Sequence, residues 1–265
     1  MHRVEDLIEL KLADASVKIH LHGATVISWQ KSGKELLFLS SKALLDGSKP
    51  IRGGIPLVFP QFGTGPIMAG QHGFARTRPW KCINQSESKA TFSLNHSEET
   101  LKAWPHEFEL NYTVELKPES LICEISVRNC GQQNFQFTSL LHTYFNIADI
   151  SSVRIEGLSG LTYKDKLYNY ESFKEHRSVI DSIDCEVDRN YINIPGPVKL
   201  YSSNGSLQIS SDFSDLGNFR NKTFLNILVV WNPWIDKAKA MADFDDEDVR
   251  IDSVNTFLIH CSTNK

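Results

Sequence analysis

The stretch LIELKLADASVKIHLHGATVISWQ, residues 7–30, alternates apolar and polar residues and turns at Gly23. A period of two places every second side chain on one face, which is typical of a β-strand with one buried face. Similar short runs follow, bounded by turn residues, among them KATFSLNHS, FELNYTVELKPESLICEISVRN, QFTSLLHTYFNI and FLNILVVWNPW. Together they predict an all-β protein, a large antiparallel β-sandwich.

Turn and helix signals are short. ELKPES (115–120) and SSNGS (202–206) have the composition of hairpin turns. SKALLDG (41–47) and SEETLKAWP (97–105) could each form one or two helical turns. We find no long 3.6-residue period, no linker and no internal repeat, so we expect a single domain over residues 1–265.

Composition excludes several classes of function. The formal net charge is -4 over 265 residues, which disfavours nucleic acid or an anionic membrane as partner. The five cysteines are spread out without a C-x-x-C pair, as in an intracellular protein with reduced thiols. The early charges in MHRVEDLIEL and the absence of a run of ~20 apolar residues argue against a signal peptide or a membrane span. We therefore expect a cytoplasmic protein.

Three weak motifs predict no site. GTGPIMAG (63–70) fits neither nucleotide-binding fingerprint. His20 and His22 would share a strand face, but no third metal ligand is near in sequence, and exposed strand histidines are common. DFDDEDVR (243–250) lacks the glycine turn of a calcium loop and is read as a solvated acidic loop. We therefore expect no metal.

Five longer blocks occur together along the chain, and as a set they are far more specific than any one of them. They resemble, in order, the signature blocks of the glucose-6-phosphate 1-epimerases, hexose-6-phosphate mutarotases of the aldose 1-epimerase superfamily. The blocks are KPIRGGIPLVFPQFG (49–63), QHGFARTRPW (71–80), LLHTYFNIADI (140–150), EVDRNYIN (186–193) and VVWNPWIDKAKAMADF (229–244). The resemblance implies a galactose-mutarotase-like β-sandwich with its substrate in a cleft on one sheet. It implies a hexose phosphate as substrate and no cofactor. We also expect a monomer.

The chemistry of anomer exchange asks for two proton-transfer groups. One group takes the proton of the C1 hydroxyl, another protonates the ring oxygen O5, and the open aldehyde recloses on its other face. An acid and a base with pKa values near neutrality suit this reaction, and histidine suits the acid. The resemblance assigns the acid to His142 of LLHTYFN.

The resemblance also implies the substrate-binding residues. According to the resemblance, the sugar phosphate is held by Arg52, Gln71 and Arg76. Arginine suits this role because its guanidinium group can donate two hydrogen bonds to phosphate oxygens. His72 would line the sugar site, and Asp188 matches a family aspartate that contacts the substrate. Arg78 could add to the positive field.

The C-terminal end leaves the catalytic base open. We expect a divergent or shortened end from about residue 246. Matching RIDSV to the family strand makes Asp252 the base, whereas a loop of the usual length puts Asn255 or Thr256 there, and neither of those can act as a base. Another acidic residue of DFDDED is a further possibility.

Three functions therefore compete. The first is an active hexose-6-phosphate 1-epimerase, for glucose 6-phosphate above all. The second is a catalytically impaired sugar-phosphate-binding protein that lacks the usual base. The third is a mutarotase for free aldoses, against which the pair Arg52 and Arg76 argues.

Overall fold

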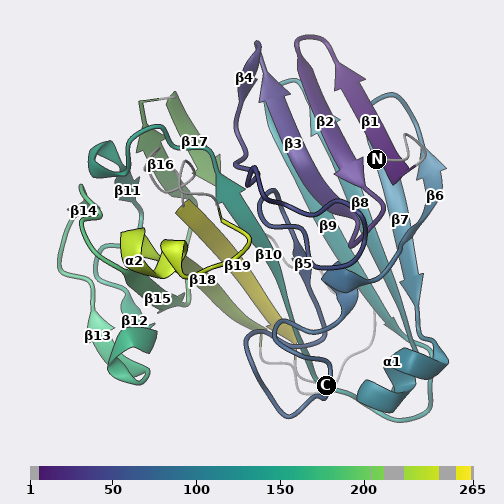
Figure 1. Ribbon diagram of the computed structural model, residues 1–265. Helices are drawn as coiled ribbons and strands as arrows, with labels where there is room; N and C mark the ends of the chain where they lie inside the picture. The colour runs from purple at the N-terminus through teal and green to yellow at the C-terminus, as the bar shows by residue number, and fades with distance from the viewer. Residues whose placement is uncertain (1–5, 204, 212–223, 245–254, 264–265) are drawn as a thin grey trace.

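The computed structural model describes residues 6–203, 205–211, 224–244 and 255–263 (Figure 1). Their named strands form four sheets. Every pairing between these described strands is antiparallel. The predicted antiparallel β-rich fold is thus confirmed.

Two four-stranded sheets, each in chain order, lie face to face as the layers of a sandwich (Figure 1). The first sheet consists of β1 (Leu7–Leu12), β2 (Ala15–His20), β3 (Thr25–Lys31) and β4 (Lys34–Glu35). The second consists of β6 (Lys81–Gln85), β7 (Lys89–Asn95), β8 (Phe108–Lys117) and β9 (Ser120–Asn129). The expected turn in ELKPES closes the β8–β9 hairpin, where Lys117 pairs with Ser120.

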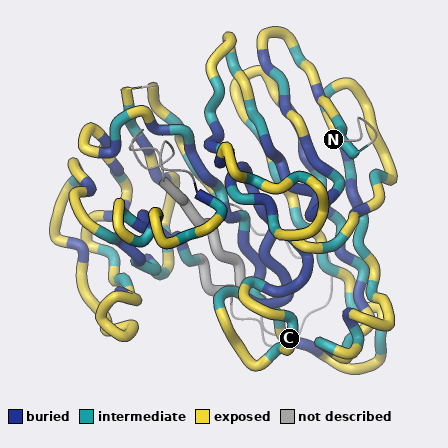
Figure 2. The backbone as a smooth tube through the Cα atoms, viewed as in Figure 1, coloured by how far each residue is buried: buried dark blue, intermediate teal, exposed yellow. Residues whose placement is uncertain are grey.

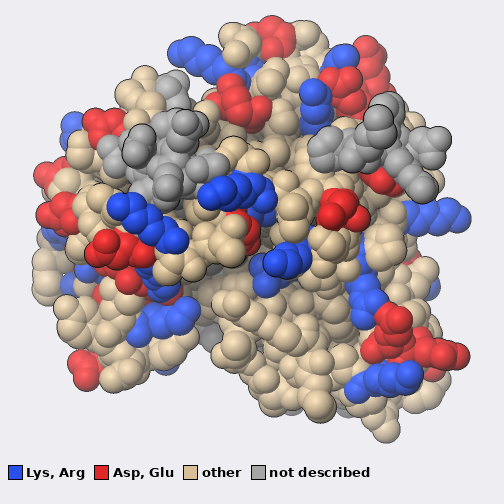
Figure 3. Space-filling view, in the orientation of Figure 1, with Lys and Arg blue, Asp and Glu red and all other residues tan. Residues whose placement is uncertain are grey.

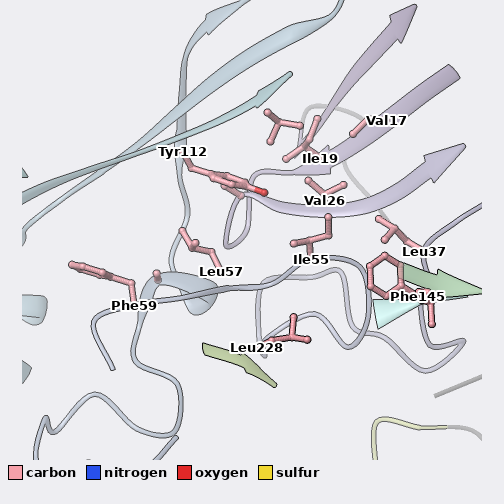
Figure 4. Packing of buried hydrophobic residues seen from close by; sticks show 14 of the residues in the cluster. Val17, Ile19, Val26, Leu37, Ile55, Leu57, Phe59, Tyr112, Phe145 and Leu228 are labelled. Carbon is pink, nitrogen blue, oxygen red and sulfur yellow. The ribbon is translucent and has the colours of Figure 1, made fainter. Parts of the chain in front are cut away.

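The period of two in the sequence becomes burial on one face. Along β8, every second residue from Phe108 to Leu116 is buried. Tyr112 of this strand lies beside Ile19 and Val26 of the opposite sheet (Figure 4). Full burial of one such apolar side chain contributes roughly 1.5–3 kcal/mol. Buried positions therefore gather between the sheets, and exposed ones follow the outer loops (Figure 2).

The remaining strands form a seven-stranded and a four-stranded sheet. The larger has the order β13 (Glu171–Lys174), β12 (Thr162–Asp165), β15 (Val187–Ile192), β18 (Phe224–Asn232), β19 (Asn255–Thr263), β10 (Phe137–Phe145) and β5 (Leu57–Val58). The smaller has the order β14 (Val179–Ile180), β11 (Arg154–Glu156), β16 (Val198–Ser202) and β17 (Gly205–Ile209). The expected SSNGS turn joins β16 to β17, where Ser202 pairs with Gly205.

Two α-helices and three short 3₁₀ segments occur in the described part of the chain. They are α1 (Glu98–Ala103), α2 (Trp234–Lys239), η2 (Ala75–Thr77), η3 (Ile150–Ser152) and η4 (Lys166–Tyr168). Helix α1 confirms the expectation for SEETLKAWP. It begins with a capping box, in which Thr100 N donates to Ser97 Oγ (3.3 Å) and Ser97 N donates to Thr100 Oγ1 (2.8 Å).

The one or two helical turns expected over residues 41–47 are not formed as a helix: the segment holds a single turn, in which the amide of Ala43 donates to Ser40 O (3.0 Å), and continues as an irregular connection. It is fixed from outside instead: the hydroxyl of the preceding Ser40 donates to the backbone oxygen of Asp243 (2.7 Å). Helix α2 was not expected. It follows β18 directly, and the side chain of Asn232 accepts from the amide of Trp234 (2.8 Å).

Strand β10 buries side chains on both faces. Leu141 and Phe145 pack against the main core cluster. Leu140 and Tyr144, on the other face, belong to two small separate clusters, and His142 lies between them in sequence and is also buried. Strand geometry thus places His142 and Tyr144 on the face turned away from the main core.

The pairing register extends this face across the sheet. Asp188 of β15 pairs with Trp231 of β18, Trp231 pairs with Thr256 of β19, and Thr256 pairs with Tyr144 of β10. Paired residues on neighbouring antiparallel strands share a face. One row of the sheet therefore joins Asp188, Trp231 and Tyr144.

Several remaining expectations concern cysteines and histidines. The described cysteine side chains, those of Cys82, Cys123, Cys130 and Cys185, are all free, as expected. His20 and His22 are not exposed strand histidines but buried side chains. The amide of His22 donates to His20 Nδ1 (3.0 Å), and His22 Nε2 lies 3.0 Å from Lys49 O.

The described residues show neither a candidate metal site nor a membrane-spanning helix. Among them, no group of three or more His, Cys, Asp or Glu side chains could hold a metal ion. None of the helices described is long and apolar enough to cross a membrane.

The turn around residues 63–73 is held in an unusual backbone conformation. His72 has φ 66°, and Gly73 has φ 71°. The His72 amide donates to Gly63 O (2.8 Å), which ties the two ends of the turn together. A Cβ at Gly73 would lie 2.1 Å from Phe59 O, so only glycine fits against the backbone of Phe59.

We predict that Gly73→Ala destabilises the protein far more than Gly70→Ala. Both glycines have a positive φ, 71° and 75°, but a Cβ at Gly70 would meet nothing within 4 Å. Gly70→Ala should therefore cost only the left-handed strain of about 1–2 kcal/mol. Gly73→Ala should cost at least about 3 kcal/mol, because a clash with backbone is added. Urea unfolding measures both, and equal losses would contradict the crowding argument.

Candidate functional site

Four basic side chains from three separate segments meet on the face of the seven-stranded sheet that carries His142 and Tyr144. We call this face the site face. We call Arg52, His72, Arg76 and His142 the histidine–arginine cluster. The positive charges of Arg52 and Arg76 act on both histidines, and the His72 and His142 rings lie 5.8 Å apart at 81°. The structure thus brings together four of the residues that the sequence predicted.

His142 sits in an aromatic cage. Its ring stacks on Tyr144, with centroids 4.7 Å apart and planes at 17°, and meets Trp231 edge-on at 6.0 Å. It is only 7% exposed, and its Nδ1 atom has no hydrogen-bond partner among the described residues. A buried nitrogen without a partner is expensive, unless a substrate completes its hydrogen bonding.

The two histidines have unusual pKa values. Burial, followed by the charges of His72, Arg76 and Arg52, holds the pKa of His142 well below its usual range. Burial, followed by Arg76, Lys166 and Arg52, lowers the pKa of His72 to about 3. The expectation of values near neutrality does not hold for this structure. The reason is desolvation of the charged imidazolium beside two guanidinium groups.

The tautomer of neutral His72 follows from one hydrogen bond. The amide of Gly63 donates to His72 Nδ1 (3.1 Å), so that nitrogen is an acceptor. The proton of the neutral ring is therefore on Nε2. His72 can offer a hydrogen-bond donor to a ligand, whereas its low pKa makes it a poor proton shuttle near pH 7.

The guanidinium group of Arg52 is held by Asp243, Tyr144 and Phe244. Its Nε and Nη2 atoms both lie 2.9 Å from Asp243 Oδ2, and Nη1 donates to the Tyr144 hydroxyl (2.9 Å). The guanidinium carbon lies 5.1 Å from the centre of the Phe244 ring. Three of five N–H donors are thus used, and the remaining two keep a fixed direction.

Arg76 has no such partner. Its Nη2 donates to the backbone oxygen of Gln71 (2.9 Å), and its buried Nε has no hydrogen-bond partner among the described residues. Its desolvation lowers the pKa of the guanidinium. No salt bridge joins Arg76 to a carboxylate of the described chain, so its half-buried positive charge is a suitable place for an external anion.

Asp188 lies on β15, at one end of the row that also contains Trp231 and Tyr144. It is 4% exposed, and Lys166 Nζ lies 3.1 Å from its Oδ2. Burial raises the pKa of Asp188, and the charges of Lys166 and Lys237 act against this rise. Its carboxylate can accept hydrogen bonds from hydroxyl groups as long as it stays ionised.

The other predicted site residues are placed differently. The side chain of Gln71 is exposed, and its described contact with the cluster runs through its backbone oxygen. Arg78 does not join the cluster but forms an ion pair with Glu99 of α1 at the surface. Asp252 lies outside the described residues. Asn255 and Thr256 begin β19, where they pair with Phe145 and Tyr144.

Three further residues of the site, Tyr144, Trp231 and Lys166, were not predicted from the sequence, whereas Asp243 belongs to the acidic run DFDDED that was considered for the base. Tyr144 and Trp231 frame His142, Asp243 holds Arg52, and Lys166 holds Asp188. The period of two could have revealed Tyr144, two residues after His142 in the same strand. On the face shown in Figure 3, basic and acidic side chains are interspersed, so no broad field of one sign marks the site.

Comparisons with known proteins show the family to which the chain belongs. Residues 6–255 match the family described as "Aldose 1-epimerase". A protein of Cenchrus ciliaris named "Putative glucose-6-phosphate 1-epimerase" is 39% identical over 252 residues, which cover 88% of this chain and 71% of that protein. A protein of the same name from Escherichia coli (strain K12) is 32% identical over 250 residues, or 91% and 79% of the two chains.

Solved structures show the same fold. The crystal structure of a "putative mutarotase" from Salmonella typhimurium has a TM-score of 0.78 at 25% identity, covering 98% of this chain and 84% of that one. A "galactose mutarotase related enzyme" from Lactobacillus acidophilus has a TM-score of 0.71 at 17% identity, with 97% and 85% covered. The predicted galactose-mutarotase-like fold is confirmed, and the chain belongs to the aldose 1-epimerase family.

Proposed function

We propose that the protein interconverts the α and β anomers of a hexose 6-phosphate, with glucose 6-phosphate as the first candidate. The observation that carries this proposal is the unpaired, desolvated Arg76 within one cluster with buried His142. A cation without an internal partner favours an anionic substrate group. The names of the relatives from Cenchrus ciliaris and Escherichia coli point to the same substrate.

In the proposed reaction, His142 gives a proton to the ring oxygen O5 and recovers it on reclosure. The free protein disfavours protonated His142, because burial and two guanidinium groups oppose its charge. A phosphate dianion on Arg52 and Arg76 would offset their charge and raise the pKa of His142. Substrate binding would then itself prepare the acid for proton transfer at O5.

The reaction also needs a base that takes the proton of the C1 hydroxyl. Asp252 remains our candidate, since its carboxylate could take the proton of the C1 hydroxyl. One observation supports the alternative of an impaired sugar-phosphate-binding protein: the backbone of Thr256, and not that of an acidic residue, pairs with both Trp231 and Tyr144. A threonine hydroxyl can hydrogen-bond to a sugar but cannot act as a base near pH 7.

The first test is anomer exchange measured by NMR on glucose 6-phosphate and on glucose, with wild-type protein and with His142→Ala. We expect exchange of the phosphorylated sugar to fall about 10²–10⁴-fold in the variant, because a general acid contributes about that factor. His176→Ala, which changes an exposed histidine, is the control. Exchange close to that of wild type in a folded His142→Ala protein would refute the assignment.

The second test separates phosphate recognition from sugar recognition. We expect Arg52→Ala and Arg76→Ala each to weaken binding of glucose 6-phosphate more than tenfold, with little change for glucose. One charge-assisted hydrogen bond contributes about 1.5–3 kcal/mol. Calorimetry measures both affinities, and Arg128→Ala, which removes an exposed arginine of β9, is the control. Equal losses for the two sugars would favour the free-aldose mutarotase.

The third test concerns the base. We expect Asp252→Asn to lower exchange about 10²–10⁴-fold while affinity for glucose 6-phosphate stays within about twofold. The reason is that an amide keeps the size of the side chain but cannot take a proton. Unchanged exchange would remove Asp252 from the mechanism. Absence of exchange in the wild-type protein, with tight binding retained, would favour the sugar-phosphate-binding protein.

A further inference from the structure

The ion pair between Lys166 and Asp188 joins the 3₁₀ segment η4 to the site face of the sheet. Lys166 Nζ lies 3.1 Å from Asp188 Oδ2, and the carboxylate is almost fully buried whereas the lysine side chain is 48% exposed. The charge of Lys166 also reaches His72. Lys166 therefore lies near the histidine–arginine cluster. Its side chain is half exposed, and its ammonium group contacts the buried carboxylate of Asp188.

The backbone around Lys166 is fixed independently of this ion pair. Asp165 caps η4, because its Oδ1 accepts from the amide of Leu167 (3.0 Å). Its other oxygen accepts from Arg189 Nε (3.1 Å), and Arg189 pairs with Asp165 across β12 and β15. The next step of this register brings Lys166 to Asp188. A change of the Lys166 side chain should therefore leave the fold of η4 intact.

Three charged residues have the largest electrostatic effects on Asp188. They are Lys166 of η4, Lys237 of α2 and Glu186, a neighbour in sequence. Lys237 forms its own ion pair with Glu186, so much of its charge is already balanced. Lys166 is thus the main counter-ion that keeps the buried carboxylate charged.

We propose that Lys166 is a positioning residue that keeps Asp188 ionised, so that Asp188 can accept hydrogen bonds from the sugar hydroxyls. This proposal rests on the proposed function for the identity of the sugar. A protonated carboxyl loses part of its accepting capacity and presents a donor instead. Lys166 acts on the sugar through Asp188 and does not itself bind the phosphate.

The first experiment follows the carboxyl carbon of Asp188 by NMR between pH 3 and 8 in the free protein, with Asp188→Asn for assignment. We expect the midpoint to rise in Lys166→Met, because burial then acts with less opposition, and to return toward wild type in Lys166→Arg. Lys174→Met removes an exposed lysine of edge strand β13 and should change nothing. An unchanged midpoint in Lys166→Met would overturn the proposal, whether or not the protein is an epimerase.

The second experiment measures affinities at pH 5 and pH 8 with glucose 6-phosphate and with inorganic phosphate. For Lys166→Met we expect at least about a threefold loss with glucose 6-phosphate at pH 5, and less than about a twofold change at pH 8. Inorganic phosphate offers no sugar hydroxyls, so its affinity should stay close to that of wild type. An equal loss with both ligands would mean that Lys166 binds phosphate directly, and no loss with either would mean that the charge of Asp188 does not serve the sugar; each result overturns the proposal. Absence of anomer exchange in wild type would instead remove the proposed function, and the titration of Asp188 would still decide the role of Lys166.

Discussion

Burial of positive charge on one face of a β-sheet is the constraint on which the site depends. The strand β10 gives Leu141 and Phe145 to the main core, and its other face carries His142 and Tyr144. Packing on both faces fixes the strand, because Leu140 and Tyr144 on the face of His142 belong to two small apolar clusters of their own. His142 is therefore fixed before any ligand arrives, and hydrogen bonds hold Arg52 and His72 of the neighbouring loops beside it.

The two arginines differ in how their charge is balanced. Asp243, Tyr144 and Phe244 satisfy Arg52, whereas Arg76 has only a backbone oxygen of Gln71. In the proposed function, an incoming anion would be attracted chiefly by Arg76 and oriented by the fixed donors of Arg52. Burial, followed by the charges of His72, Arg76 and Arg52, holds the pKa of His142 well below its usual range in the free protein, and in the proposed reaction an anion on the arginines would raise it.

Local patterns predicted the elements, and contacts between distant segments decided the rest. The capping box of α1 and the turn of the β8–β9 hairpin are complete within a few residues, so they were predicted correctly. Residues 41–47 have helical composition, but the contact of Ser40 with Asp243 spans 203 residues and is invisible locally. Family blocks predicted His142 and both arginines. Lys166 was missed because only the pairing of β12 with β15 brings it to Asp188.

The site is also tied to the order in which the sheet is assembled. Strand β19 is formed by residues 255–263, yet it lies between β18 and β10. The row that joins Asp188, Trp231 and Tyr144 therefore passes through Thr256 near the end of the described chain. Pairings of such long sequence separation carry a large loop-closure entropy and form late in folding. His142 on one side and Trp231 on the other can thus be brought to their observed contact only when this strand is inserted. The site is therefore complete only in the fully paired sheet.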